Sequence, residues 1–94
     1  MQKYAVYQNK SGNGFLLDVQ TELLSGLNTR VVVPLLFQSE SPTPAGRLNP
    51  IFEIEGETLV MATQFIAAVP GSELTLPIHN LNKHHQQITE ALDM

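Results

Sequence analysis

The chain has 94 residues, 43% of them hydrophobic, with a formal net charge of −4 and no cysteine. This length suits a single domain covering residues 1–94, and the apolar content excludes an intrinsically disordered segment. Without cysteine, a disulfide framework and thiolate metal sites are excluded. No apolar run reaches membrane-helix length and the N-terminus lacks a signal-peptide core, so we expect a cytoplasmic protein.

The basic residues are few and scattered. Nucleic-acid binding usually draws on clustered Lys and Arg side chains that displace counterions from phosphates. Here the five basic residues lie far apart in the sequence, at Lys3, Lys10, Arg30, Arg47 and Lys83. We therefore expect a protein partner and no direct nucleic-acid binding. A domain of this size would also gain stability from association with a second copy.

The first third of the chain predicts three strands. Residues 2–8 alternate in part, which favours a half-buried strand, and the turn-forming residues 9–14 predict a hairpin loop. Residues 15–19 and 31–36 are short apolar runs whose length and β-branched content favour buried strands over helix. Because Pro34 has no N–H for a sheet ladder, it marks a sheet edge, a bulge or a bend between two sheets.

Two charged residues lie at the ends of these apolar runs. Asp18 is compatible with a catalytic carboxylate or with a side chain that accepts a hydrogen bond from a turn amide. We favour the turn, because no His, Lys or second acid lies at a suitable spacing. Arg30 opens the second run, where it can donate hydrogen bonds to carbonyl groups of the turn.

The middle of the chain alternates between loops and strands. Residues 38–50 contain three prolines without periodicity and predict a long loop. Residues 51–54 predict a strand, and Gly56 supplies the turn that follows it. The apolar run 59–69 is compatible with a strand or a helix, and its flanking turns favour one long strand. Residues 74–76 predict one further, brief strand.

The last segment has the period of a helix. One stripe of this helix is apolar, and its members are Leu81, Ile88 and Leu92, with His85 and Ala91 beside it. Either Asn80 or Asn82 can N-cap the helix. The pattern stops at Met94 without a stop signal, so we expect a helix that is cut short or that ends against a partner.

The residues that carry chemistry do not assemble into a known constellation. His84 and His85 are adjacent, so they point about 100° apart on a helix and cannot share a metal ion, and His79 lies outside the helix. There is no glycine-rich phosphate loop and no nucleophile elbow. We predict no metal, no cofactor and no enzymatic activity. The residues indicate a small, mostly antiparallel β domain with a C-terminal helix, dimeric, which works by binding.

Several segments occur in a characteristic order along essentially the whole chain. They are Met1-Gln2 with Val6-Tyr7, then Asp18-Val19-Gln20-Thr21-Glu22-Leu23-Leu24, then Thr29-Arg30-Val31-Val32-Val33-Pro34-Leu35, then Met61-x-Thr63 with Ala67-Ala68-Val69-Pro70. In this combination and order, the segments resemble the CcdB family of toxins from control-of-cell-death toxin–antitoxin modules.

The resemblance implies a fold and a function. The expected fold is an SH3-like, barrel-type antiparallel β core with a C-terminal helix, in a homodimer. The expected function is that of a type II toxin in plasmid maintenance, which is not an enzyme. It binds the A subunit of DNA gyrase and traps the complex of gyrase with cleaved DNA, and a cognate antitoxin neutralises it.

The resemblance also implies site residues. Those expected to bind gyrase are Leu23, Leu24 and Asp93. Those expected to bind the antitoxin lie in the loops 8–14 and 38–50, and they are Lys10, Asn13 and Arg47. Those expected at the dimer interface are Ala67, Ala68 and Val69. The leucine pair has an alternative role as buried core, which is the commonest fate of leucine.

Two alternatives remain open. Family members continue past the position of Met94 with an aromatic or aliphatic residue followed by Gly-Ile, and this tail is central to gyrase poisoning. A shortened or non-toxic relative would keep the fold and the antitoxin binding but not the poisoning. The other alternative is a ribonuclease on a similar barrel, which needs a basic groove, and the acidic charge argues against it.

Overall fold

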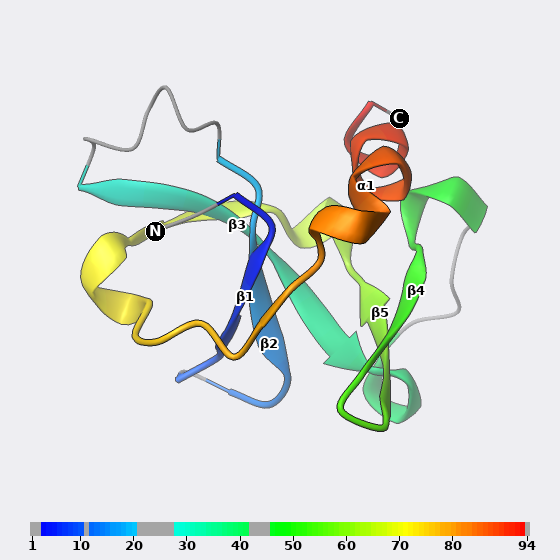
Figure 1. Cartoon of the computed structure of the whole chain (residues 1–94), viewed down its shortest axis with the longest axis horizontal. Coiled ribbons are helices and arrows are strands. Elements are labelled where there is room, and N and C mark those ends of the chain that lie inside the picture. Colours follow the sequence, from blue (N-terminus) through cyan, green and yellow to red (C-terminus); the bar gives the residue numbers. More distant parts are fainter. Residues whose placement is uncertain (1–2, 11, 21–27, 42–45, 94) are drawn as a thin grey trace.

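A computed structural model describes residues 3–10, 12–20, 28–41 and 46–93. Within these residues the chain forms antiparallel strands and one α-helix, α1 (His85–Leu92), as Figure 1 shows. The strands are β1 (Ala5–Gln8), β2 (Phe15–Asp18), β3 (Thr29–Phe37), β4 (Ile51–Ile54), β5 (Glu57–Met61), β6 (Ala67–Pro70) and β7 (His79–Asn80). Short 3₁₀ helices join them: η2 (Gln38–Glu40), η3 (Gly46–Leu48), η4 (Thr63–Phe65), η5 (Gly71–Glu73) and η6 (Asn82–His84). The predicted fold class, a barrel-type antiparallel β core with a C-terminal helix, is confirmed, and the strands form a nearly closed barrel.

The other strands are arranged around β3. The order across the sheet is β4-β5-β3-β2-β1-β7, and β6 also pairs with β3. On one edge of β3, residues 29–32 pair with β6 and residues 35–37 pair with β5. Pro34 lies where the partner changes, and its carbonyl accepts a hydrogen bond from the Ala62 N–H at 2.9 Å. Pro34 therefore lies within one continuous sheet, and of the three positions expected for it the structure shows the bulge, which the neighbouring chain forms at the point where β3 changes its partner.

The prediction of one long strand over residues 59–69 is wrong, although strand rather than helix was correct. The run forms β5 and β6 with η4 between them, and both strands pair with the same edge of β3. Residues 62–66 bulge outward opposite Val33 and Pro34. Because Pro34 has no N–H, the ladder cannot continue there. The Thr63 hydroxyl donates to the Leu48 carbonyl at 2.5 Å and so helps to hold residues 62–66 in this position.

The brief strand predicted at residues 74–76 is also wrong, and β7 forms a little later instead. Leu74 turns inward and is buried, whereas Leu76 is 82% exposed. Pro77 cannot donate to a ladder, so pairing with β1 begins only where the Ile78 N–H donates to the Val6 carbonyl at 2.8 Å. The chain therefore passes over β1 as an irregular segment before it reaches β7.

That irregular segment explains why β1 is buried on both faces rather than half-buried. Val6 points into the main core, which joins the strands to α1, and Ala5 and Tyr7 point into a second, smaller core. Leu74 completes the smaller core from the segment that follows η5. Alternate residues of one strand thus serve two apolar clusters.

The helix begins later than predicted. Asn80 does not cap α1; its Oδ1 accepts a hydrogen bond from the Asn82 N–H at 2.7 Å and so opens η6. His84 precedes α1 and makes no side-chain cap bond. Of the predicted stripe, Leu81, Ile88 and Ala91 are buried and Leu92 is partly buried, while His85 is exposed. The apolar face of α1 therefore packs on the barrel as its period indicated.

Candidate functional site

A buried ion pair joins the end of β2 to the start of β3. Asp18 and Arg30 are both fully buried, at 0% exposure of their side chains. Arg30 Nε donates to Asp18 Oδ2 at 2.8 Å, and Arg30 Nη2 lies 2.6 Å from the same oxygen. Opposite charges at this distance in a dry environment attract strongly, and this attraction offsets part of the cost of removing both from water.

Gln20 extends this pair into a network. Its backbone N–H donates to Asp18 Oδ1 at 3.0 Å, so the interpretation of Asp18 as an acceptor for a turn amide is confirmed. The side-chain oxygen of Gln20 accepts a hydrogen bond from the Val31 N–H at 2.9 Å, and the Val19 N–H donates to the Val31 carbonyl at 3.0 Å. The network therefore fixes the chain on both sides of residues 21–27. Arg30 bonds the carboxylate rather than the turn carbonyls predicted for it.

Of the three residues predicted to bind gyrase, the structure describes Asp93 alone. Leu23 and Leu24 lie outside the residues that the structure describes. Asp93 is exposed directly after α1, and its backbone N–H donates to the Thr89 carbonyl at 3.0 Å. The start of β3 and α1 lie toward opposite ends of the long axis in Figure 1. Asp93 is therefore exposed at the end of α1, and α1 lies away from the start of β3.

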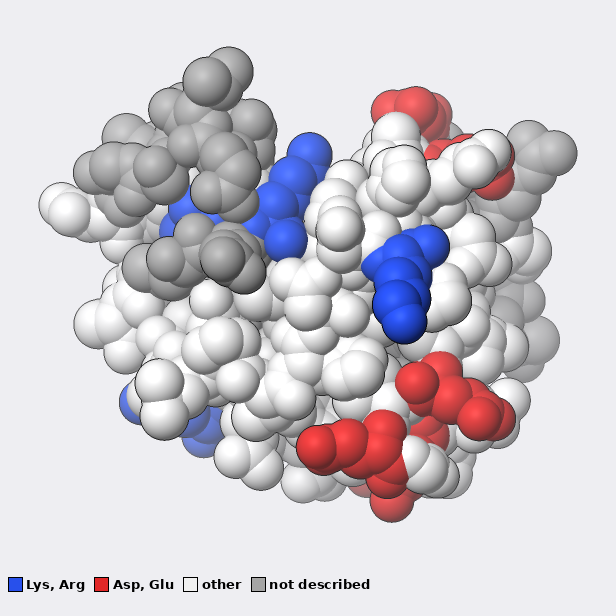
Figure 2. Space-filling model, viewed as in Figure 1, with Lys and Arg blue, Asp and Glu red and all other residues white. Residues whose placement is uncertain are grey.

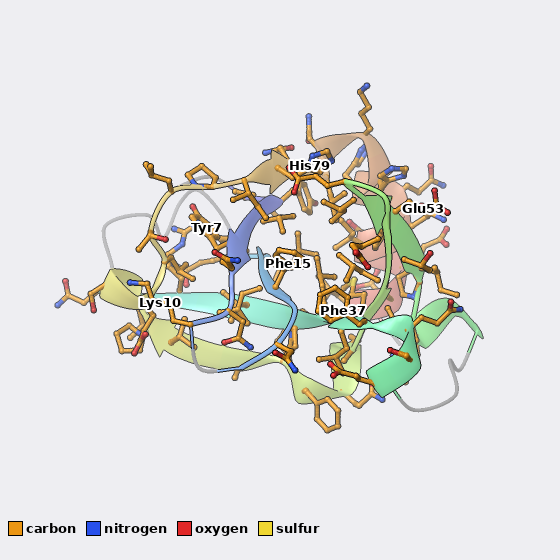
Figure 3. The ribbon with its side chains drawn as sticks, turned by 90° about the horizontal axis from the view of Figure 1, so that it is seen from below. Tyr7, Lys10, Phe15, Phe37, Glu53 and His79 are labelled. Carbon is orange, nitrogen blue, oxygen red and sulfur yellow. The ribbon has the colours of Figure 1, made fainter. Side chains whose placement is uncertain are left out.

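The residues predicted to bind the antitoxin fall into two places. Lys10 and Asn13 lie in the loop between β1 and β2, both exposed, and Asn13 Nδ2 donates to Glu40 Oε2 at 3.3 Å. Arg47 lies in η3, and its side chain is outside the described part of the structure. Figure 1 and the label of Lys10 in Figure 3 place η3 and Lys10 at opposite ends of the long axis. The structure does not bring these residues into one site.

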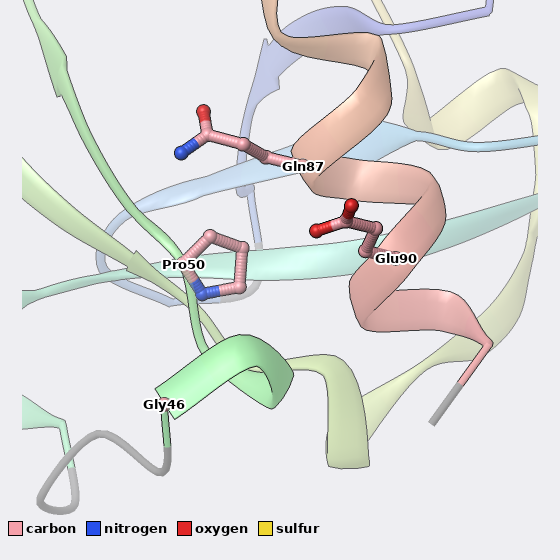
Figure 4. A pocket seen from close by; sticks show the side chains of 4 residues that line it. All are labelled: Gly46, Pro50, Gln87 and Glu90. Atoms are coloured by element: carbon pink, nitrogen blue, oxygen red, sulfur yellow. The ribbon is translucent and has the colours of Figure 1, made fainter.

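Next to η3 is a cavity of about 340 Å³ that α1 closes on one side. Its lining residues, drawn in Figure 4, are Gly46, Pro50, Gln87 and Glu90. The polar groups come from the helix and the apolar ones from the chain that enters β4. The cavity brings the loop predicted to bind the antitoxin next to α1.

The residues predicted for the dimer interface begin β6 and extend an apolar surface. Ala67 and Ala68 are exposed and Val69 is partly buried. Phe65 and Ile66 directly precede them and are 52% and 46% exposed. We call residues 65–69 the β6 apolar edge. Sequence reasoning missed Phe65 and Ile66, although both belong to the apolar run 59–69, because the run alone does not show which half is buried.

The described residues hold no group of three or more His, Cys, Asp or Glu side chains that could bind a metal ion. The His84 ring instead contacts the Phe52 ring, with centroids 5.2 Å apart. Over the same residues, no helix is long and apolar enough to cross a membrane.

Fold and surfaces together define a small antiparallel β-barrel protein with a C-terminal helix and an exposed apolar edge of the kind that contacts other proteins. Residues 3–94 match the family model described as CcdB protein, so the chain belongs to the CcdB family. This family consists of non-enzymatic toxins of toxin–antitoxin systems, and the resemblance noted in the sequence is confirmed. No curated protein matches the chain.

Proposed function

We propose that this CcdB-family toxin binds the A subunit of DNA gyrase and traps the complex of gyrase with cleaved DNA, and that a cognate antitoxin neutralises it. The observation that carries the proposal is the family match over residues 3–94. In this proposal Leu23, Leu24 and Asp93 contact gyrase. The buried network of Asp18, Gln20 and Arg30 supports it, because the network fixes the residues on either side of the segment 21–27, to which the leucine pair belongs in the sequence.

The proposal includes a homodimer formed through the β6 apolar edge. Exposed aromatic and aliphatic side chains favour burial against another protein, and a second copy would cover Phe65 and Ile66 together with Ala67, Ala68 and Val69. The antitoxin contacts Lys10, Asn13 and Arg47. Because these lie toward opposite ends of the molecule, it reaches them with an extended segment or with two separate ones.

The test is a binding titration of the chain against a fragment of the gyrase A subunit, beside a cleavage assay with whole gyrase and supercoiled plasmid. We expect binding and an increase in linear DNA. Leu24→Asp places a charge where an apolar contact is expected and should abolish both. Leu76→Asp makes the same chemical change at a leucine that is 82% exposed elsewhere, so it serves as the matched control.

The titration also includes a version of the chain extended by an aromatic residue and Gly-Ile. Binding by the extended version alone would assign the 94-residue chain to the antitoxin-binding alternative. If neither version binds gyrase, the gyrase proposal is wrong. Equal binding by Leu24→Asp and Leu76→Asp would reject the assignment of the leucine pair.

A further inference from the structure

The pairing of β4 with β5 determines which backbone groups of β4 remain free. The Met61 N–H donates to the Pro50 carbonyl at 2.9 Å, so these two residues form a hydrogen-bonded pair. In an antiparallel ladder, bonded and non-bonded pairs alternate. Ile51 and Glu53 are opposite Val60 and Thr58, in the non-bonded pairs. Their N–H and C=O groups therefore point away from β5.

The edge of β4 toward which these groups point carries no strand in the described part of the chain. Within the sheet, β4 pairs with β5 alone. Ile51 is 45% exposed and Glu53 is exposed, whereas the alternate residues Phe52 and Ile54 are buried. The edge thus presents the N–H and C=O groups of two residues, Ile51 and Glu53. The strand is held in place because the side chains of Phe52 and Ile54 are buried in the core.

The charges beside this edge are negative. Glu53, Glu55 and Glu57 are all exposed on the β4–β5 hairpin, and Figure 2 shows a red patch on this side of the molecule with a blue basic area above it. Across the described residues, no ion pair occupies these three carboxylates. Pairing of two β4 strands from two copies would bring carboxylates of the same sign together, which disfavours a second copy as the occupant.

We propose that the free edge of β4 is a docking edge at which an extended, cationic segment of a partner polypeptide adds as one more strand. The main-chain bonds to Ile51 and Glu53 give the segment its register, and Lys or Arg side chains next to Glu53 give it specificity. The proposal goes beyond the proposed function, because neither residue belongs to the surfaces assigned to gyrase, the antitoxin or the dimer.

The test uses the full chain and a short acetylated peptide in which Lys alternates with Val or Thr. Amide hydrogen exchange is followed by NMR with and without a saturating concentration of the peptide. We expect the amides of Ile51 and Glu53 to exchange rapidly in the free chain and to become protected in the complex. The amides of Phe52 and Ile54 bond to β5 and should be protected in both states.

Variants separate the contribution of the Glu53 charge to peptide binding from that of the backbone hydrogen bonds. Glu53→Lys should raise the Kd of the peptide about tenfold, because it replaces an attraction between opposite charges with a repulsion between like charges. Glu73→Lys makes the same charge change in η5 and should leave the Kd unchanged. Ile51→Pro removes one outward N–H without breaking a bond to β5 and should also weaken binding, while Ile51→Thr keeps the N–H and should bind normally.

Two results would overturn the proposal. Binding without protection of Ile51 and Glu53 would show a diffuse electrostatic contact rather than strand addition. If the peptide does not bind to the wild-type chain, the carboxylates prevent strand addition at this edge, which is a common role of charged residues on edge strands. Neither result depends on gyrase, so both can be distinguished from a failure of the proposed function.

Discussion

Asp18 and Arg30 carry opposite charges inside a sheet whose neighbouring side chains are apolar. Removing each charge from water costs several kcal/mol, and only good geometry and full hydrogen bonding offset this. The carboxylate meets both conditions through Arg30 and the Gln20 N–H, whereas Arg30 Nη1 is buried without a hydrogen-bond partner. We infer that the pair contributes more to fixing where β2 ends and β3 begins than to net stability.

This view of the pair leads to the first stability prediction. Asp18→Ala or Arg30→Ala leaves a buried charge without its partner and should lower the free energy of unfolding by about 3–5 kcal/mol. The double variant Asp18→Leu with Arg30→Met removes both charges and should be more stable than either single variant. Urea denaturation measures all three, with Glu40→Ala as the control that loses only the exposed bond to Asn13. A double variant less stable than both singles would contradict the inference.

Gly14 gives a second prediction at the scale of one residue. Its φ is +87°, and a Cβ there would meet the carbonyl oxygen of Leu35. Gly56 has a similar φ of +83° in the β4–β5 turn but open space around it. Gly56→Ala should therefore cost about 1–2 kcal/mol from backbone strain alone. Gly14→Ala should cost about 1–3 kcal/mol more, because the clash adds to the strain.

The comparison is made by chemical denaturation of both variants under the same conditions. Its value is that the φ angles are nearly matched, so the difference isolates the contact with Leu35. Equal losses of stability in Gly14→Ala and Gly56→Ala would show that the β1–β2 loop moves aside without cost.

At the scale of elements, the sequence predicted which strands and helices exist better than it predicted where a strand is interrupted. The apolar runs before Asp18 and after Arg30 predicted β2 and β3, because alternation and β-branching are local properties. The break between β5 and β6 depends on Pro34, which lies on another strand, so no pattern within residues 59–69 could reveal it.

The candidate site was harder to predict than the fold. The Asp18–Arg30 pair has a sequence signal, since one charge ends an apolar run and the other opens the next, and a hairpin places such ends together. The gyrase, antitoxin and dimer residues came from the family resemblance, because recognition surfaces have no periodicity of their own. Their distances in space depend on the whole topology, as the separation of Lys10 from η3 illustrates.

The β6 apolar edge gives a prediction for an element. Ala68→Glu places a carboxylate on this edge, at a position whose side chain is exposed in one copy. We expect this variant to fold and to be monomeric, because a buried unpaired charge opposes association. Sedimentation velocity of the variant beside the wild type measures the change. Leu76→Glu, at an exposed leucine outside the edge, should leave the dimer intact. A dimeric Ala68→Glu variant would exclude this edge as the interface.

Across the whole molecule, the proposed contacts are spread along one axis. The chain measures 35 Å in its longest dimension, and the loop with Lys10 and the element with Arg47 lie toward its two ends. An extended chain covers at most about 3.3–3.6 Å per residue, so an antitoxin segment spanning both needs about ten residues. This size favours an extended partner over a compact one.

Dimer formation by so small a chain should make its free energy of unfolding depend on protein concentration. The barrel has few residues with which to bury apolar surface, and covering the β6 apolar edge adds burial that the monomer lacks. Because unfolding then separates two chains, each tenfold rise in protein concentration should raise the free energy of unfolding by about 1.4 kcal/mol. Thermal and urea midpoints of the wild type, measured over a hundredfold range of concentration, should therefore rise. The midpoint of Ala68→Glu should stay constant and lie below that of the wild type. If the wild-type midpoint does not move at concentrations where sedimentation shows a dimer, association does not contribute to folding, and the barrel is stable by itself.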